Sequence, residues 1–156
     1  MSYAVSVDLS AKVEQWSKNT AVAYSNGIQG SVLVRSKIKQ KMRDWLKVRY
    51  PNRRQAFYYR LLFALFIYIL IKPVLNKLEY IVIDRDYPGK ESEQVIKDFL
   101  LNFLQHGEPS LRGGFIKFRE VRGSKADVMA RDVYEENREA DREISLREMQ
   151  QYLIRQ

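Results

Sequence analysis

The chain has 156 residues, a formal net charge of +8 and a hydrophobic fraction of 46%, which is enough apolar material for one domain with its own core. It contains no cysteine, which excludes a disulfide framework, a thiolate nucleophile and a zinc ribbon, and fits a reducing, cytoplasmic (intracellular) location. The basic excess favours a polyanionic partner such as nucleic acid or an anionic membrane surface. Residues 1–8 lack the basic flank and long apolar core of a signal peptide.

The first third of the chain predicts three antiparallel strands. Residues 3–8 alternate between apolar and small or polar side chains, the pattern of a strand, and this strand ends near Asp8. Residues 20–24 and 30–38 predict a second and a third strand, with Asn26-Gly27 as a turn between them. We therefore expect a meander at the start of the domain.

Positive charge is concentrated between residues 35 and 60, where ten basic residues face a single acidic one, Asp44. If the third strand continues to residue 43, every second side chain is basic and stands on one face. This strip is either a lysine-protected edge strand or a surface that binds the phosphates of nucleic acid. The residues expected to bind nucleic acid are Arg35, Lys37, Lys39, Lys41, Arg43, Lys47, Arg49, Arg53, Arg54 and, further along the chain, Lys125.

An uninterrupted apolar run covers residues 61–71. A membrane-spanning helix needs about 20 apolar residues, so this run of eleven is too short. A helix from about residue 51 to Pro73 that is apolar all round in its second half is typical of the interior of a domain. We expect no transmembrane segment.

Residues 80–83 are four β-formers without polar alternation, the pattern of a central parallel strand covered on both faces. The strand ends on two carboxylates, Asp84 and Asp86, and Pro88-Gly89 supplies a turn directly afterwards. Open α/β sheets place their chemistry at the carboxyl ends of such strands. Asp84 and Asp86 are therefore candidates for a functional site.

The remaining pattern predicts a helix over residues 91–105 that stops at Gly107, a parallel strand over 115–121 and a helix over 124–137 with Asp127 in its first turn. The residues up to 137 form the expected domain. In the charged tail, residues 138–156, Ser145 and Glu148 form a capping box for a last helix. Its apolar stripe fits packing on the domain and a homodimer interface equally well.

This order of elements, together with Asp8, Asp84 and Asp127, resembles the ribonuclease H-like superfamily of nucleases, resolvases and transposases over residues 3–137. The resemblance implies an α/β fold with a mixed five-stranded sheet, three antiparallel strands followed by parallel ones, flanked by helices. Residues 60–78 carry no carboxylate, whereas ribonucleases H proper have a Glu in the long helix. A resolvase-like or transposase-like variant therefore fits better.

The resemblance also implies a metal-dependent nuclease that acts on DNA or RNA. Asp8, Asp84 and Asp127 would be catalytic, and the same three with Asp86 would hold Mg²⁺ or Mn²⁺, since hard cations prefer carboxylate oxygens. Two such ions about 4 Å apart activate water and stabilise the leaving oxygen of a phosphodiester. Lys125 could contact a phosphate beside the site.

The same residues also fit roles without catalysis. Taken singly, Asp8 could cap or turn the chain after its strand, and Asp84 or Asp86 could be a turn acceptor before Pro88. Asp127 could stabilise the start of a helix. The chain could then be a non-catalytic nucleic-acid-binding protein, or a peripheral protein that uses its basic strip on anionic lipid.

A second nuclease pattern, that of restriction-endonuclease-like folds, would use Asp84, Glu120 and Lys125. It has Arg122 where lysine is usual, and a whole helix separates Asp84 from Glu120, so it fits less well than the ribonuclease H-like pattern.

Overall fold

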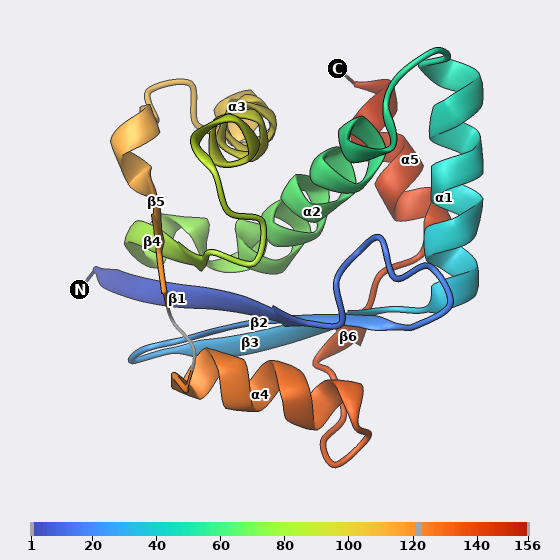
Figure 1. Cartoon of the computed structure of the whole chain (residues 1–156). Helices are drawn as coiled ribbons and strands as arrows, with labels where there is room; N and C mark the ends of the chain where they lie inside the picture. The colour runs from blue at the N-terminus through green and yellow to red at the C-terminus, as the bar shows by residue number, and fades with distance from the viewer. Residues whose placement is uncertain (1, 121–122, 156) are drawn as a thin grey trace.

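The computed structural model describes residues 2–120 and 123–155 of the chain (Figure 1). The described residues contain six strands and five α-helices, with two short 3-10 helices. The strands are β1 (Tyr3–Ser10), β2 (Thr20–Ser25), β3 (Gln29–Val34), β4 (Leu78–Asp84), β5 (Ile116–Arg119) and β6 (Arg142–Glu143). The helices are α1 (Ser36–Arg49), α2 (Gln55–Ile71), η1 (Lys72–Lys77), α3 (Lys90–Gly107), η2 (Gly113–Phe115), α4 (Lys125–Tyr134) and α5 (Leu146–Ile154).

The strands form one mixed sheet in the order β5-β4-β1-β2-β3-β6. Strands β1, β2 and β3 are antiparallel neighbours, whereas β4 is parallel to β1 and β5 is parallel to β4. This confirms the mixed α/β sheet. The expected count of five strands is wrong, because β6 in the tail pairs in parallel with β3. With only two residues, β6 leaves no periodic pattern in the sequence.

The helices lie in two layers (Figure 1). Helices α1, α2, α3 and α5 cover one face of the sheet, and α4 lies alone on the other. The main core fills the first face, where Val5 and Val7 of β1 meet the apolar side chains of α2. On the second face, α4 packs Met129 and Ala130 against Ala23 of β2.

Helix α2 runs through the centre of the main core. All eleven residues from 61 to 71 are buried, as their lack of amphipathic pattern predicts. The segment Gln55–Lys77 is long and apolar enough to cross a membrane, but 67% of an apolar stretch of 18 residues within it is buried inside the protein. The structure is therefore consistent with a core helix and with no transmembrane segment.

The expected extension of the third strand through residues 35–43 is wrong. Strand β3 ends at Val34, and Ser36, whose N–H donates to the Asn19 side chain at 2.9 Å, begins α1. Met42 and Leu46, four residues apart, face the core from α1. Because a helix has 3.6 residues per turn, the basic side chains spaced by two do not share one face.

The tail belongs to the same core. Met149 and Leu153 of α5 are buried in the main cluster, and the Tyr152 ring meets Tyr68 of α2 edge-on with centroids 5.1 Å apart. At the start of α5, the hydroxyl of Ser145 accepts the N–H of Glu148 at 3.2 Å, which confirms the N-cap half of the predicted capping box. The Glu148 carboxylate pairs with Arg142. The apolar stripe of α5 is thus occupied within the chain.

Candidate metal centre

Two adjacent parallel strands bring Asp8 and Asp84 together. In the pairing of β1 with β4, Val7 lies opposite Ile83, so the next residue of each strand is an aspartate at the same edge of the sheet. Asp86 follows two residues after Asp84. One carboxylate oxygen from each of the three aspartates lies within 4.8 Å of the others. We call these three residues the aspartate cluster.

Two residues of the cluster are buried and the third, Asp86, is half-buried. Asp8 is 3% exposed and Asp84 is 9% exposed. The backbone N–H of Leu9 donates to Asp8 Oδ1 at 2.8 Å. The Oδ2 atom of Asp86 is buried and has no hydrogen-bond partner among the described residues, and a buried oxygen of this kind costs free energy unless something else binds it.

Burial and mutual repulsion disfavour the ionised forms. Burial raises the pKa of Asp8 to about 9, and the hydrogen bond and charge of Asp86, with the charge of Asp84, add to this effect. Burial and the charge of Asp84 raise the pKa of Asp86 to about 6, although its hydrogen bond with Asp8 and the charge of Lys12 oppose the rise. Close carboxylates cannot all ionise cheaply without a compensating cation.

The donor set fits a hard divalent cation. All the groups that converge in the cluster are carboxylates, the ligands that Mg²⁺ and Mn²⁺ prefer. A bound cation would cancel the repulsion between the carboxylates and would supply a partner for the buried Oδ2 of Asp86. The residues that would hold the ion are Asp8, Asp84 and Asp86.

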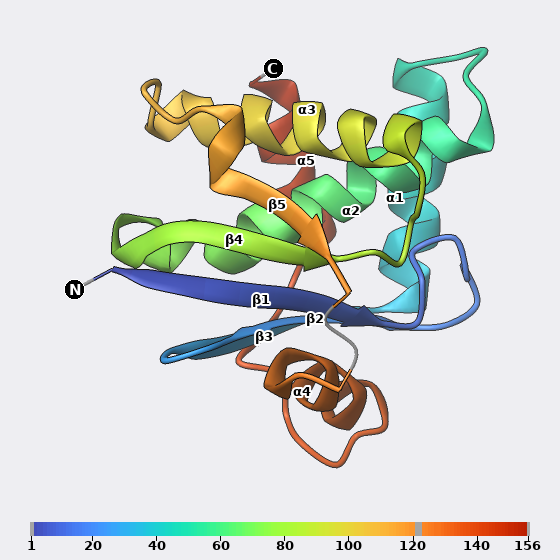
Figure 2. The same cartoon turned by 60° about the vertical axis from the view of Figure 1, so that its left-hand side comes forward.

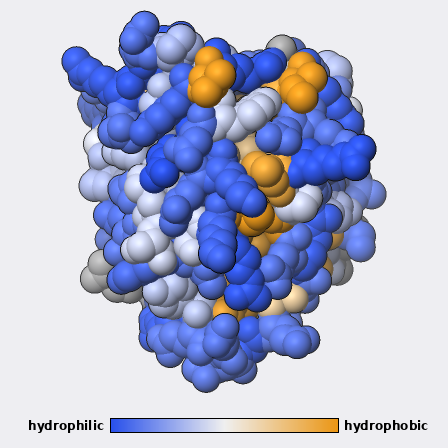
Figure 3. Space-filling view, turned by 90° about the vertical axis from the view of Figure 1, so that its right-hand side faces the viewer, coloured by the Kyte–Doolittle hydropathy of each residue, from blue (hydrophilic) through white to orange (hydrophobic). Residues whose placement is uncertain are grey.

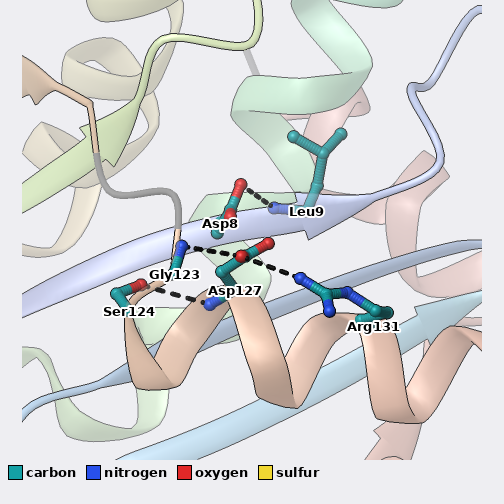
Figure 4. A network of polar contacts seen from close by, with 6 residues as sticks. All are labelled: Asp8, Leu9, Gly123, Ser124, Asp127 and Arg131. Atoms are coloured by element: carbon teal, nitrogen blue, oxygen red, sulfur yellow. Dashed lines mark hydrogen bonds and ion pairs between the residues drawn. The ribbon is translucent and has the colours of Figure 1, made fainter.

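Asp127 lies outside this cluster. Its Oδ2 accepts the backbone N–H of Gly123 at 2.8 Å and a guanidinium N–H of Arg131 at 3.1 Å (Figure 4). Its own N–H donates to Ser124 Oγ, the N-cap of α4, at 3.2 Å. In this structure Asp127 stabilises the start of α4, the structural role that its place in the first turn allows.

A loop between β1 and β2, residues 11–19, is fixed beside the cluster. The Tyr87 hydroxyl accepts the N–H of Val13 at 2.9 Å and donates to Glu14 at 3.0 Å. Tyr87, next to Asp86, is itself buried and its ring stacks on Tyr59. No pattern in the sequence indicates this contact, since residues 13 and 87 are far apart in the chain.

Lys39 of α1 holds the same loop. Its ammonium group donates to Val13 O at 3.1 Å, Gln15 O at 3.0 Å and Thr20 Oγ1 at 2.9 Å. The side chain has no exposed surface, and burial lowers its pKa to about 8. All three donors are therefore used inside the protein, and Lys39 lies outside any surface that a phosphate could reach.

The other basic residues of the expected strip occupy the surface of α1 and the α1–α2 loop. Arg35 is paired with Glu143 at 2.9 Å, and Arg43 is half-buried beside Asp44 at 3.0 Å. Figure 3 shows the side of the molecule on which α1 lies as mostly hydrophilic, with small hydrophobic patches. The exposed basic residues of α1 and the loop are Lys37, Lys41, Lys47, Arg49, Arg53 and Arg54.

The residues of the second nuclease pattern lie on three separate parts of the fold. Glu120 lies just beyond β5 and outside the aspartate cluster, and Lys125 begins α4. Arg122 falls outside the described residues. Among the described residues, the aspartate cluster contains Asp84 and not Glu120.

The chain matches no protein-family model, no curated protein and no solved structure. No relative therefore supplies a function. What the site can do follows from the donor set, the burial and the surrounding charge of the chain's own residues.

Proposed function

We propose that the protein is a metal-dependent nuclease that hydrolyses phosphodiester bonds of DNA or RNA. The observation that supports this most is the aspartate cluster, whose three carboxylates converge at the carboxyl ends of two neighbouring parallel strands. A site of this composition is costly to fold without a cation. Mg²⁺ or Mn²⁺ bound there would activate water and stabilise the leaving oxygen.

The order and direction of the first five strands support a ribonuclease H-like fold as part of this proposal. The central strand β1 carries Asp8, its parallel neighbour β4 ends on Asp84, and β2 and β3 extend the sheet on the other side. Within α2, Arg60 is the one charged residue, so no acidic group reaches the site from this helix. The proposal therefore favours the resolvase-like or transposase-like branch.

Two groups of residues would have separate roles in the proposed reaction. Asp8, Asp84 and Asp86 would bind the cation. The exposed lysines and arginines of α1 would bind backbone phosphates through salt-sensitive contacts. Helix α1 is linked to the neighbourhood of the cluster through Lys39, which donates to Val13 O of the 11–19 loop, and Tyr87, next to Asp86, accepts the N–H of the same Val13.

The decisive experiment is cleavage of labelled single-stranded, duplex and branched DNA and RNA in Mg²⁺, Mn²⁺ or EDTA, with Asp84→Asn beside the parent protein. We expect metal-dependent cutting by the parent and none by the variant, whose binding in EDTA should persist. Failure of the parent to cut any of these substrates in either metal would overturn the proposal.

A non-catalytic nucleic-acid-binding protein is the second candidate. The exposed basic residues of α1 favour it, because they can bind phosphates whether or not the aspartate cluster holds a cation. Such a protein would bind nucleic acid equally well in Mg²⁺ and in EDTA, and Asp84→Asn would leave its binding unchanged. The same experiment thus separates the two candidates.

A further inference from the structure

A groove of about 470 Å³ runs over the α4 side of the sheet. Its lining includes Ala4, Ser6, Tyr80, Val82, the basic Arg119 and the acidic Glu120. A space of this volume falls in the range of about 300–1,000 Å³ found for small-ligand sites. It can hold a group the size of a nucleotide but not the cross-section of a duplex.

The groove leads to the aspartate cluster. Side chains two residues apart on a strand share a face, so Ser6 precedes Asp8 on the same face of β1, and Val82 precedes Asp84 on the same face of β4. Ser6 lies opposite Val82 in the β1–β4 pairing. The groove floor therefore ends two residues before Asp8 on β1 and two residues before Asp84 on β4, on the face of the sheet to which both aspartates belong.

Basic side chains border this path on β5. Lys117 lies opposite Val82, and Arg119 lies opposite Asp84, in the parallel pairing of β4 with β5. The Lys117 ammonium group is 3.9 Å from the centroid of the Tyr80 ring. The exposed Arg119 thus stands beside the cluster, where a phosphate approaching Asp84 would pass.

We propose that this groove holds the sugar–phosphate backbone of a single nucleic-acid strand and leads it to the aspartate cluster. This inference rests on the proposed nuclease function. Arg119, which lines the groove, and Lys117, which borders it on β5, bind phosphates. The small side chains of Ala4 and Ser6 leave room for the backbone. Because Lys117 covers one face of the Tyr80 ring, bases cannot stack on that face. The groove therefore recognises the sugar–phosphate backbone and not the base sequence.

The test measures binding of fluorescein-labelled single strands of about 15 nucleotides by anisotropy in EDTA, with NaCl varied. Arg119→Gln and Lys117→Gln should each weaken binding several-fold and lower the slope of log K against log[salt] by about 0.7, the value for one phosphate contact on a single strand. Arg147→Gln is the matched control. Arg147 is exposed on α5, in the opposite layer of the fold (Figure 2).

Oligo-dT and oligo-dA of equal length should bind within about threefold of each other, because phosphate contacts carry no sequence information. A strong preference between them would contradict the backbone groove. Unchanged binding and salt slope in both groove variants, together with weaker binding by Lys47→Gln on α1, would also overturn it.

Binding and cleavage measurements together distinguish a wrong groove assignment from a wrong nuclease proposal. If the parent cuts with metal and Asp84→Asn does not, while the groove variants match the Arg147→Gln control in binding and in KM, the groove assignment is wrong and the function stands. If the groove variants lose binding but no protein cuts any substrate, the groove stands as a binding surface and catalysis is wrong.

Discussion

The hydroxyl of Tyr87 accepts the backbone N–H of Val13 across 2.9 Å. This contact ties the residue after Asp86 to the loop that follows Asp8. Tyr87→Phe should lower the free energy of unfolding by about 1–3 kcal/mol, since it leaves a buried N–H unpaired. Urea unfolding measures the decrease, and Tyr59→Phe, which keeps the ring stacked on Tyr87, should cost less. Equal decreases in the two variants would show that the hydrogen bond between Tyr87 and Val13 does not account for the effect.

Stability in EDTA should fall as the pH rises. The pKa of Asp8, about 9, and that of Asp86, about 6, both exceed the unfolded value of about 4. Between about pH 4 and 9 the folded state therefore binds more protons than the unfolded state, and the free energy of unfolding decreases with pH. Urea midpoints between pH 5 and 9 should decline in the parent and decline less in Asp8→Asn.

A divalent cation should reverse this trend. Mg²⁺ or Mn²⁺ competes with the protons on Asp8 and Asp86, so its stabilising effect should grow with pH. Saturation at 100 times the dissociation constant should raise the free energy of unfolding by about 2.7 kcal/mol. Thermal unfolding with and without Mn²⁺ measures this shift, and Asp84→Asn should show little of it. An equal shift in the variant would place cation binding elsewhere.

Lys39→Met should destabilise the fold without a direct effect on nucleic-acid binding. The substitution removes the donor to Val13 O, Gln15 O and Thr20 Oγ1, and unpaired buried acceptors cost about 1–3 kcal/mol each. Chemical unfolding measures the decrease in stability. At a temperature at which the variant is folded, the slope of log K against log[salt] for nucleic-acid binding should equal that of the parent. A slope smaller by the value for one phosphate contact would show that Lys39 binds a phosphate.

Substitution of the exposed lysines of α1 should weaken nucleic-acid binding and leave stability almost unchanged. The double variant Lys41→Gln/Lys47→Gln should change stability by less than about 0.5 kcal/mol. It should lower the salt slope of duplex binding by roughly 0.9 for each phosphate that the two lysines neutralise in the parent. Anisotropy across a NaCl series checks this. A parent-like slope would show that α1 does not bind the phosphate backbone.

Asp127→Asn should cost about 1 kcal/mol of stability, because the Asp127 carboxylate accepts the N–H of Gly123 before α4 and pairs with Arg131. We expect Mn²⁺ affinity close to that of the parent, since Asp127 lies outside the aspartate cluster. Calorimetric titration of Mn²⁺ checks this. A tenfold weaker affinity would show that Asp127 moves to the cation when it binds.

The sequence predicted those parts of the fold that leave a periodic pattern. The meander, the buried strand that ends at Asp84, the core helix α2 and the N-cap Ser145 all follow from local patterns. The start of α1 does not follow from a local pattern. Basic side chains at every second position are typical of a strand, and Lys39 is buried only through tertiary packing. The short β6 was missed because two residues carry no period.

The candidate site was predictable in part, for the same reason. Asp8 and Asp84 end strands whose parallel pairing follows from the fold class, so their proximity could be expected. The inclusion of Asp86, and the exclusion of Asp127, depends on loop and side-chain conformations that local sequence does not determine. The contact of Tyr87 with the 11–19 loop joins residues 74 positions apart, beyond the reach of any local pattern.

The pairing of β1 with β4 also has a consequence for folding. The chain must close a loop of about 75 residues before Val7 meets Ile83, and such non-local parallel contacts form slowly because the loss of chain entropy comes first. A nascent chain that ends before residue 78 has all its early strands and its most apolar helix, but lacks the strand that brings Asp84 to Asp8. Hydrogen exchange in the centre of β1 should therefore require global unfolding, and the aspartate cluster should form only after β4 has paired with β1.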